Sequence, residues 1–83
     1  MKYDDLTEQE KKAVKEALEY IDYWDVAEDI EMLQEWLDDG TISLCTGRSG
    51  LPAVWILTES REIAVYVYTL EPLSQEELMA EFL

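Results

Sequence analysis

Carboxylates are the side chains of this 83-residue chain with the clearest capacity for chemistry, and they are unevenly placed. Ten acidic residues and no Lys or Arg lie between Glu16 and Asp39. As one helix, this segment would be about 36 Å long, with roughly one negative charge per 3.6 Å. One DNA strand carries about one charge per 3.4 Å, and the duplex about one per 1.7 Å. The segment therefore predicts a surface that can occupy a protein site built for phosphates.

The second half of this segment separates apolar from acidic residues most clearly. At about 100° per residue, the apolar residues from Val26 to Leu37, including Ile30, would form a buried stripe along one side of a helix. The acidic residues would fill an arc of roughly 140° on the opposite side of that helix. No Lys or Arg stands four residues from any of these acids, and Asp38 and Asp39 lie at the helix end where the dipole disfavours anions. A sequence shaped only by stability would place Lys here. We predict partner contacts by Glu16, Glu19, Asp22, Asp25, Glu28, Glu31, Met32, Glu35, Asp38 and Asp39.

Apolar side chains beside the acids are candidate anchors for a complex, because charge steers the encounter while buried anchors hold it. Met32 projects toward the edge of the acidic arc and is the preferred anchor. We expect Trp36, which flanks the arc, to pack in the core. Tyr20, Tyr23 and Trp24 cluster at a bend between helices. They are expected to close the helix junction, with an exposed contact patch as the alternative.

Catalytic and metal chemistry find little support. The chain has no His, the commonest general base and metal ligand. Cys45 has no basic neighbour to lower its pKa and is expected to be a small, partly buried strand residue. The EF-hand spacing is missing, and Gly47–Gly50 is too short for a phosphate loop and lacks its Lys. We predict a protein that is not an enzyme, with no catalytic residue, no metal ligand and no cofactor.

Composition limits the partners and the compartment. A 48% apolar content is enough for a folded chain, although the net charge is −14. Such a charge excludes unaided binding to nucleic acid or to an anionic membrane, and favours a basic partner. The single cysteine, the polar N-terminus and the lack of a long apolar run predict a cytoplasmic protein.

The helices that must position the acids have clear boundary signals. Thr7–Glu10 has the form of a capping box. The first helix then pairs opposite charges at Glu8–Lys12, Lys12–Glu16 and Lys15–Glu19, so its outer face is expected to neutralise itself. The apolar pattern slips phase at Asp22–Asp25, which predicts a bend. Asp25 is the expected cap of a second helix that ends before Gly40.

The rest of the chain predicts a small antiparallel sheet and a short terminal helix. Strands are expected at 41–46, 53–58 and 63–70, joined by turns at 47–50 and 59–62. A second capping box begins at Ser74, with Leu73 and Leu78 as its hydrophobic staple. The predicted fold is one α+β domain over residues 1–83, with two N-terminal helices packed on a three-stranded antiparallel sheet and a short C-terminal helix, in the order α-α-β-β-β-α.

The last two strands are apolar on both faces, and two helices cover only one face well. Tyr66 and Tyr68 share one face of the last strand. If the helices cover the other face, these tyrosines mark an exposed surface that a homodimer or another partner can use.

In length, charge and the acidic run from Glu16 to Asp39, the chain resembles a class of small acidic inhibitors that bacteriophages encode against host defence enzymes. The class includes DNA-mimic anti-restriction proteins, uracil-DNA glycosylase inhibitors and acidic anti-CRISPR proteins. The resemblance implies a mechanism in which carboxylates occupy the Lys/Arg groove of a nucleic-acid-binding protein and exclude its substrate. It implies anti-CRISPR activity as the first specific function, exerted in the host cytoplasm if a phage encodes the chain.

One alternative of a different class remains. An immunity protein or antitoxin that neutralises a cognate toxin, often a nuclease, would show much the same electrostatics. Halophilic adaptation is disfavoured, because it spreads acids over every element while residues 41–58 contain none. Neither Ser43 nor Ser74 lies in the sequence context that an acyl carrier protein needs.

Overall fold

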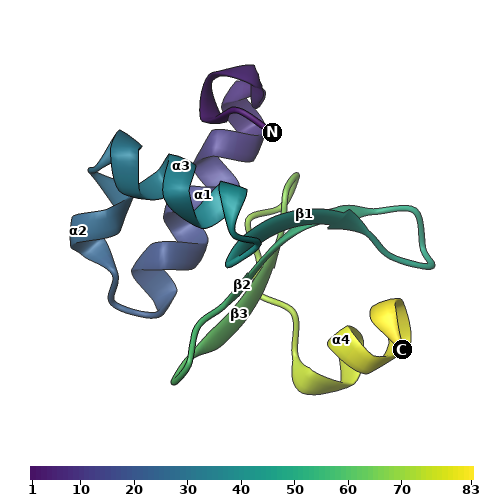
Figure 1. Ribbon diagram of the computed structural model, residues 1–83. Coiled ribbons are helices and arrows are strands. Elements are labelled where there is room, and N and C mark those ends of the chain that lie inside the picture. The colour runs from purple at the N-terminus through teal and green to yellow at the C-terminus, as the bar shows by residue number, and fades with distance from the viewer.

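Helices cover both faces of one three-stranded sheet in the computed structural model, which describes residues 1–83 (Figure 1). The α+β class is confirmed, although three helices rather than two precede the sheet. No helix is both long and apolar enough to cross a membrane. In chain order the elements are a 3₁₀ turn η1 (Tyr3–Asp5), α1 (Glu8–Tyr20), α2 (Trp24–Ala27), α3 (Ile30–Asp38), β1 (Ile42–Thr46), β2 (Pro52–Leu57), β3 (Glu62–Tyr66) and α4 (Gln75–Phe82).

The sheet is antiparallel in the order β1-β2-β3, and strict alternation gives it two apolar faces. One face presents Val54, Ile56 and Val65 to α1–α3. The other presents Ala53 and Ala64 to the C-terminal segment. The expected strands and turns are confirmed to within two residues, except that β3 ends at Tyr66 instead of reaching residue 70.

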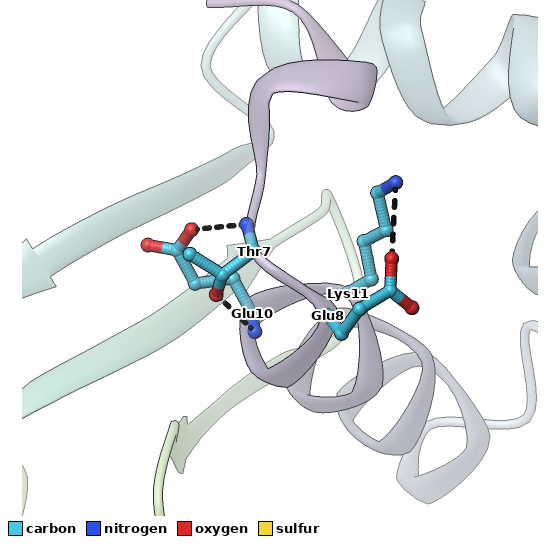
Figure 2. A network of polar contacts seen from close by, with 4 residues as sticks. All are labelled: Thr7, Glu8, Glu10 and Lys11. Carbon is cyan, nitrogen blue, oxygen red and sulfur yellow. Dashed lines mark hydrogen bonds and ion pairs between the residues drawn. The ribbon is translucent and has the colours of Figure 1, made fainter.

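The start of α1 confirms the first predicted capping box (Figure 2). The Thr7 hydroxyl accepts a hydrogen bond from the backbone N–H of Glu10 at 3.1 Å, and the Glu10 carboxylate accepts one from the N–H of Thr7 at 2.7 Å. The predicted charge pairing is wrong, because none of the three expected pairs forms. Lys11 instead lies 3.8 Å from Glu8, one turn earlier, and this is the only ion pair in the structure.

The predicted bend is confirmed, and backbone hydrogen bonds make it. The N–H of Tyr23 donates to the carbonyl of Leu18 at 2.9 Å, and the N–H of Asp22 donates to the carbonyl of Glu19 at 3.1 Å. With Asp22 at φ 62°, this is a Schellman ending, in which a left-handed residue reverses the chain after the last helical turn. Asp is one of the few residues with a side chain that tolerates this conformation.

The structure corrects three expectations for the second predicted helix: it is broken into α2 and α3, Asp25 is not its cap, and Ile30 is not buried. Asp25 lies inside α2 and caps nothing. The cap is Asp29, whose carboxylate accepts hydrogen bonds from the N–H groups of Glu31 and Met32 at 3.1 and 3.2 Å. Because α3 starts afresh at Ile30, its buried face turns toward Met32, Leu33, Trp36 and Leu37. The Ile30 side chain is 61% exposed rather than buried.

The C-terminal segment covers the face of the sheet that α1–α3 leave free. Ser74 and Glu77 form the second capping box, and Leu73 and Leu78 are both buried beside Ala53 and Ala64. The Phe82 ring lies 5.3 Å from the ring of Trp55. The face that Tyr66 shares is therefore already occupied by α4, and a homodimer through the sheet stays a prediction.

The left-handed residue at the bend offers a test of the local structure. We expect Asp22→Gly to change the free energy of unfolding by no more than about 0.5 kcal/mol, because glycine adopts φ 62° without a Cβ clash. Asp22→Val removes the same charge but should lower that free energy by about 1–2 kcal/mol. Urea unfolding of both variants measures the difference. Equal stability of the two would contradict the assigned ending of α1.

Candidate functional site

The predicted acidic residues lie on α1–α3 and the bend between them, on the side of the sheet opposite α4, and their side chains are exposed or half-buried. They follow the last turns of α1, the bend, α2 and α3, so they form a folded surface instead of one straight rod (Figure 1). All are exposed except Glu16 and Glu19, which are half-buried. We call the following ten residues the acidic surface: Glu16, Glu19, Asp22, Asp25, Glu28, Asp29, Glu31, Glu35, Asp38 and Asp39.

Three members of the acidic surface have structural roles within the chain. Asp29 caps α3, as described above. Asp38 accepts a hydrogen bond from the Gln34 amide at 2.9 Å. Asp39, at the end of α3, accepts one from the backbone N–H of Thr41 at 2.9 Å. These contacts explain why aspartates stand at a helix end that disfavours anions.

The other seven carboxylates of the acidic surface make no hydrogen bond or ion pair within the chain. The one ion pair lies in the first turn of α1, away from them. No Lys or Arg nitrogen lies within 4.0 Å of their oxygens, and like charges on neighbouring side chains repel one another. Seven unpaired carboxylates on one side of a small domain suit contact with cations carried by another molecule. They are Glu16, Glu19, Asp22, Asp25, Glu28, Glu31 and Glu35.

Arg61 reaches the bend after α1 from the β2–β3 turn and forms no ion pair with a carboxylate. Its guanidinium donates a hydrogen bond to the carbonyl of Ile21 and lies 5.2 Å from the centre of the Tyr23 ring. It thereby holds the negative end of α1 against the sheet. The sequence alone gave no sign of this contact, because 40 residues separate the partners.

Two aromatic side chains at the bend are exposed, contrary to the core packing that we expected. Trp24 is 56% exposed and Tyr20 is 50% exposed. Together with Glu16 and Glu19 they line a shallow pocket of about 170 Å³. Aromatic faces beside carboxylates form a site suited to the ammonium or guanidinium group of a Lys or Arg.

The remaining candidate anchors pack inward. Tyr23 and Trp36 meet edge to face with ring centres 5.3 Å apart, which confirms the core assignment of Trp36. Met32 is half-buried against the core, because the break before α3 turns that face inward. Its contact with a partner stays a prediction, with less free surface than the sequence pattern suggested. Of the candidate anchors, the exposed ones are Tyr20 and Trp24.

The groups that could do covalent or metal chemistry are not assembled into a site. Cys45 is half-buried in β1, and its sulfur lies 3.7 Å from the carbonyl oxygen of Ala53. Burial raises the pKa of this thiol, which disfavours the reactive thiolate. No three metal-ligating side chains converge anywhere in the chain. The acidic surface with its aromatic pocket is thus the arrangement with the clearest capacity for binding.

Comparison with protein-family models, curated proteins and solved structures finds no match for this chain.

The end of α3 yields a prediction about charge. The hydroxyl and the backbone N–H of Thr41 hold the pKa of Asp39 below its usual value of 3.8. We expect Thr41→Val to raise the Asp39 pKa toward 3.8, because the hydroxyl is lost while the backbone N–H remains. Carboxyl carbon NMR of Asp39 between pH 6 and pH 2 measures the shift, and an unchanged pKa would contradict the assigned hydrogen bonds.

The same contact affects stability with a defined sign. Since the pKa of Asp39 is lower in the folded chain, the stabilisation by Thr41 is complete above 3.8 and is lost as pH falls through the folded pKa. As pH falls through that range, the free energy of unfolding should therefore decrease less for the Thr41→Val variant than for the unchanged chain. Urea unfolding at several pH values measures the difference.

Proposed function

We propose that this chain is a protein inhibitor without catalytic activity of its own, which binds a basic nucleic-acid-binding partner through the acidic surface and excludes that partner's DNA or RNA. One observation carries the proposal: seven exposed or half-buried carboxylates on one side of the domain have no partner within the chain. A groove of Lys and Arg that normally holds phosphates is the complementary surface.

Electrostatics would act mainly on the rate at which the complex forms. Exposed charges attract over about 8 Å at physiological ionic strength, so the acidic surface would steer a basic groove toward it. Exposed ion pairs add little affinity individually, and buried anchors hold such complexes. The pocket of Tyr20 and Trp24 supplies an anchor, because a Lys or Arg of the partner can insert between the rings and the two glutamates.

The specific function that we propose first is inhibition of a host defence complex in the cytoplasm, of the anti-CRISPR or DNA-mimic type. No continuous helix spans residues 16–39, because the chain bends between α1, α2 and α3. This supports a surface that imitates the charge density of DNA rather than the shape of a straight duplex. Three short helices would bring carboxylates to a curved groove.

An immunity protein or antitoxin is the second candidate. The pocket of Tyr20 and Trp24 suits it equally well, because a Lys or Arg on the surface of a cognate toxin can insert there too. The two candidates differ in whether DNA competes with the chain for its partner.

Affinity capture from a host lysate at low and high salt tests the proposal, with bound proteins identified by mass spectrometry. We expect capture of a nucleic-acid enzyme that added duplex DNA displaces. A variant with Glu28, Glu31 and Glu35 changed to Gln should lose about three- to 150-fold in affinity for that enzyme, since each exposed ion pair contributes about 0.2–1 kcal/mol. Trp24→Ala should weaken binding further through the pocket.

A matched variant carries the same loss of charge on other surfaces: Asp5→Asn, Glu59→Gln and Glu76→Gln, all exposed. It should bind nearly as well as the unchanged chain. Equal weakening by both variants would show that only net charge matters, and full binding by the first variant would eliminate the acidic surface. A partner indifferent to DNA would favour the immunity protein.

A further inference from the structure

A second pocket, here called the groove, lies where the loop after β3 and the start of α4 come near the β1–β2 turn. Figure 1 shows α4 on the face of the sheet opposite α1–α3. Its volume is about 260 Å³. Drug-sized ligands and cofactors occupy pockets of roughly 300–1,000 Å³, so this groove suits a single side chain. Its main lining residues are Leu51, Pro52, Tyr66, Tyr68, Glu71 and Glu77.

The loop that forms the rim is held firmly by the backbone. The N–H of Tyr66 donates to the carbonyl of Glu71, and the N–H of Leu70 donates to the carbonyl of Tyr66, both at 2.9 Å. Leu70 adopts φ 62°, a costly conformation for a bulky residue, while its side chain packs against the main core. The rim that presents Tyr68 and Glu71 is therefore preformed, and Tyr68 is 70% exposed.

The charges of the groove are all negative. The Glu71 carboxylate has no partner within the chain, and no Lys or Arg lines the groove. Glu77 receives the N–H of Ser74 at 3.0 Å on one oxygen and the Tyr66 hydroxyl at 3.3 Å on the other. The capping contacts of Ser74 hold the pKa of Glu77 below its usual value, so it is charged at neutral pH.

We propose that this groove binds the side chain of an arginine from a partner polypeptide. A guanidinium is planar, stacks on aromatic rings and forms paired hydrogen bonds with carboxylates, which matches two tyrosines beside two glutamates. The exposed Leu51 at the rim adds apolar contact for residues next to that arginine. The chain's own Arg48 is engaged elsewhere, since it donates to the carbonyl of Leu83.

This site is independent of the inhibitor proposal. It lies on the α4 side of the sheet, whereas the acidic surface lies on the α1–α3 side (Figure 1). Either site can fail its test while the other passes, because no residue belongs to both.

Titration of the isotope-labelled chain with two short peptides tests the site, one with a central arginine and the other with citrulline, its uncharged analogue. Backbone amide NMR should show saturable shifts at Leu51, Tyr68, Thr69 and Glu71 with the arginine peptide. The citrulline peptide should bind at least about tenfold more weakly, since hydrogen bonds to charged groups contribute about 1.5–3 kcal/mol.

Variants separate the groove from general attraction to an acidic protein. Tyr68→Ala should weaken arginine binding about two- to fivefold, the effect of an exposed cation–π contact, and Glu71→Gln should weaken it as well. Glu76→Gln, an exposed neighbour outside the groove, should leave it unchanged. Shifts confined to residues 16–39, equal binding of citrulline, or full binding by a folded Tyr68→Ala variant would each overturn the proposal.

Discussion

The whole structure depends on burying one face of α1 against β2 and β3. Ala13, Val14, Ala17 and Leu18 have no solvent exposure, and they meet Val54, Ile56 and Val65 on the sheet. Full burial of a large apolar side chain contributes about 1.5–3 kcal/mol. This small core has to outweigh the self-repulsion of a chain with net charge −14. It also fixes the direction in which the last turns of α1 present Glu16 and Glu19.

Local signals in the sequence predicted much of this architecture. Both capping boxes, the end of α3 before Gly40, the bend near Asp22 and the antiparallel sheet follow from residue types at short spacing. The acids of the candidate site were also correctly expected at the surface, because a carboxylate without a partner is costly to bury.

The errors arose where a tertiary contact or a competing cap decided the outcome. Asp29 is a stronger cap than Asp25 in this context, because its carboxylate reaches two free N–H groups. That one choice exposes Ile30 and turns Met32 inward. The pairing of Arg61 with Ile21, and the cover that α4 provides for Ala53 and Ala64, join residues far apart in the chain. A pattern of helical period carries no information about such contacts.

Each of the two pockets has two aromatic rings, two glutamates and no Lys or Arg in its lining, and the one beside α4 also has Leu51, Pro52 and Thr69. The aromatic rings supply an anchoring surface that charge alone lacks, and the glutamates select a cation. In our account, one pocket belongs to the acidic surface and the other is a separate site for arginine. In this account, the excess negative charge is selective where aromatic rings lie beside it.

Hydrogen–deuterium exchange of the chain alone and bound to its captured partner tests the central claim most directly. Our account predicts slower exchange at backbone amides of residues 16–39 in the complex, with little change in the strands β1 and β2. Protection restricted to the sheet and α4, with residues 16–39 exchanging as in the free chain, would contradict it.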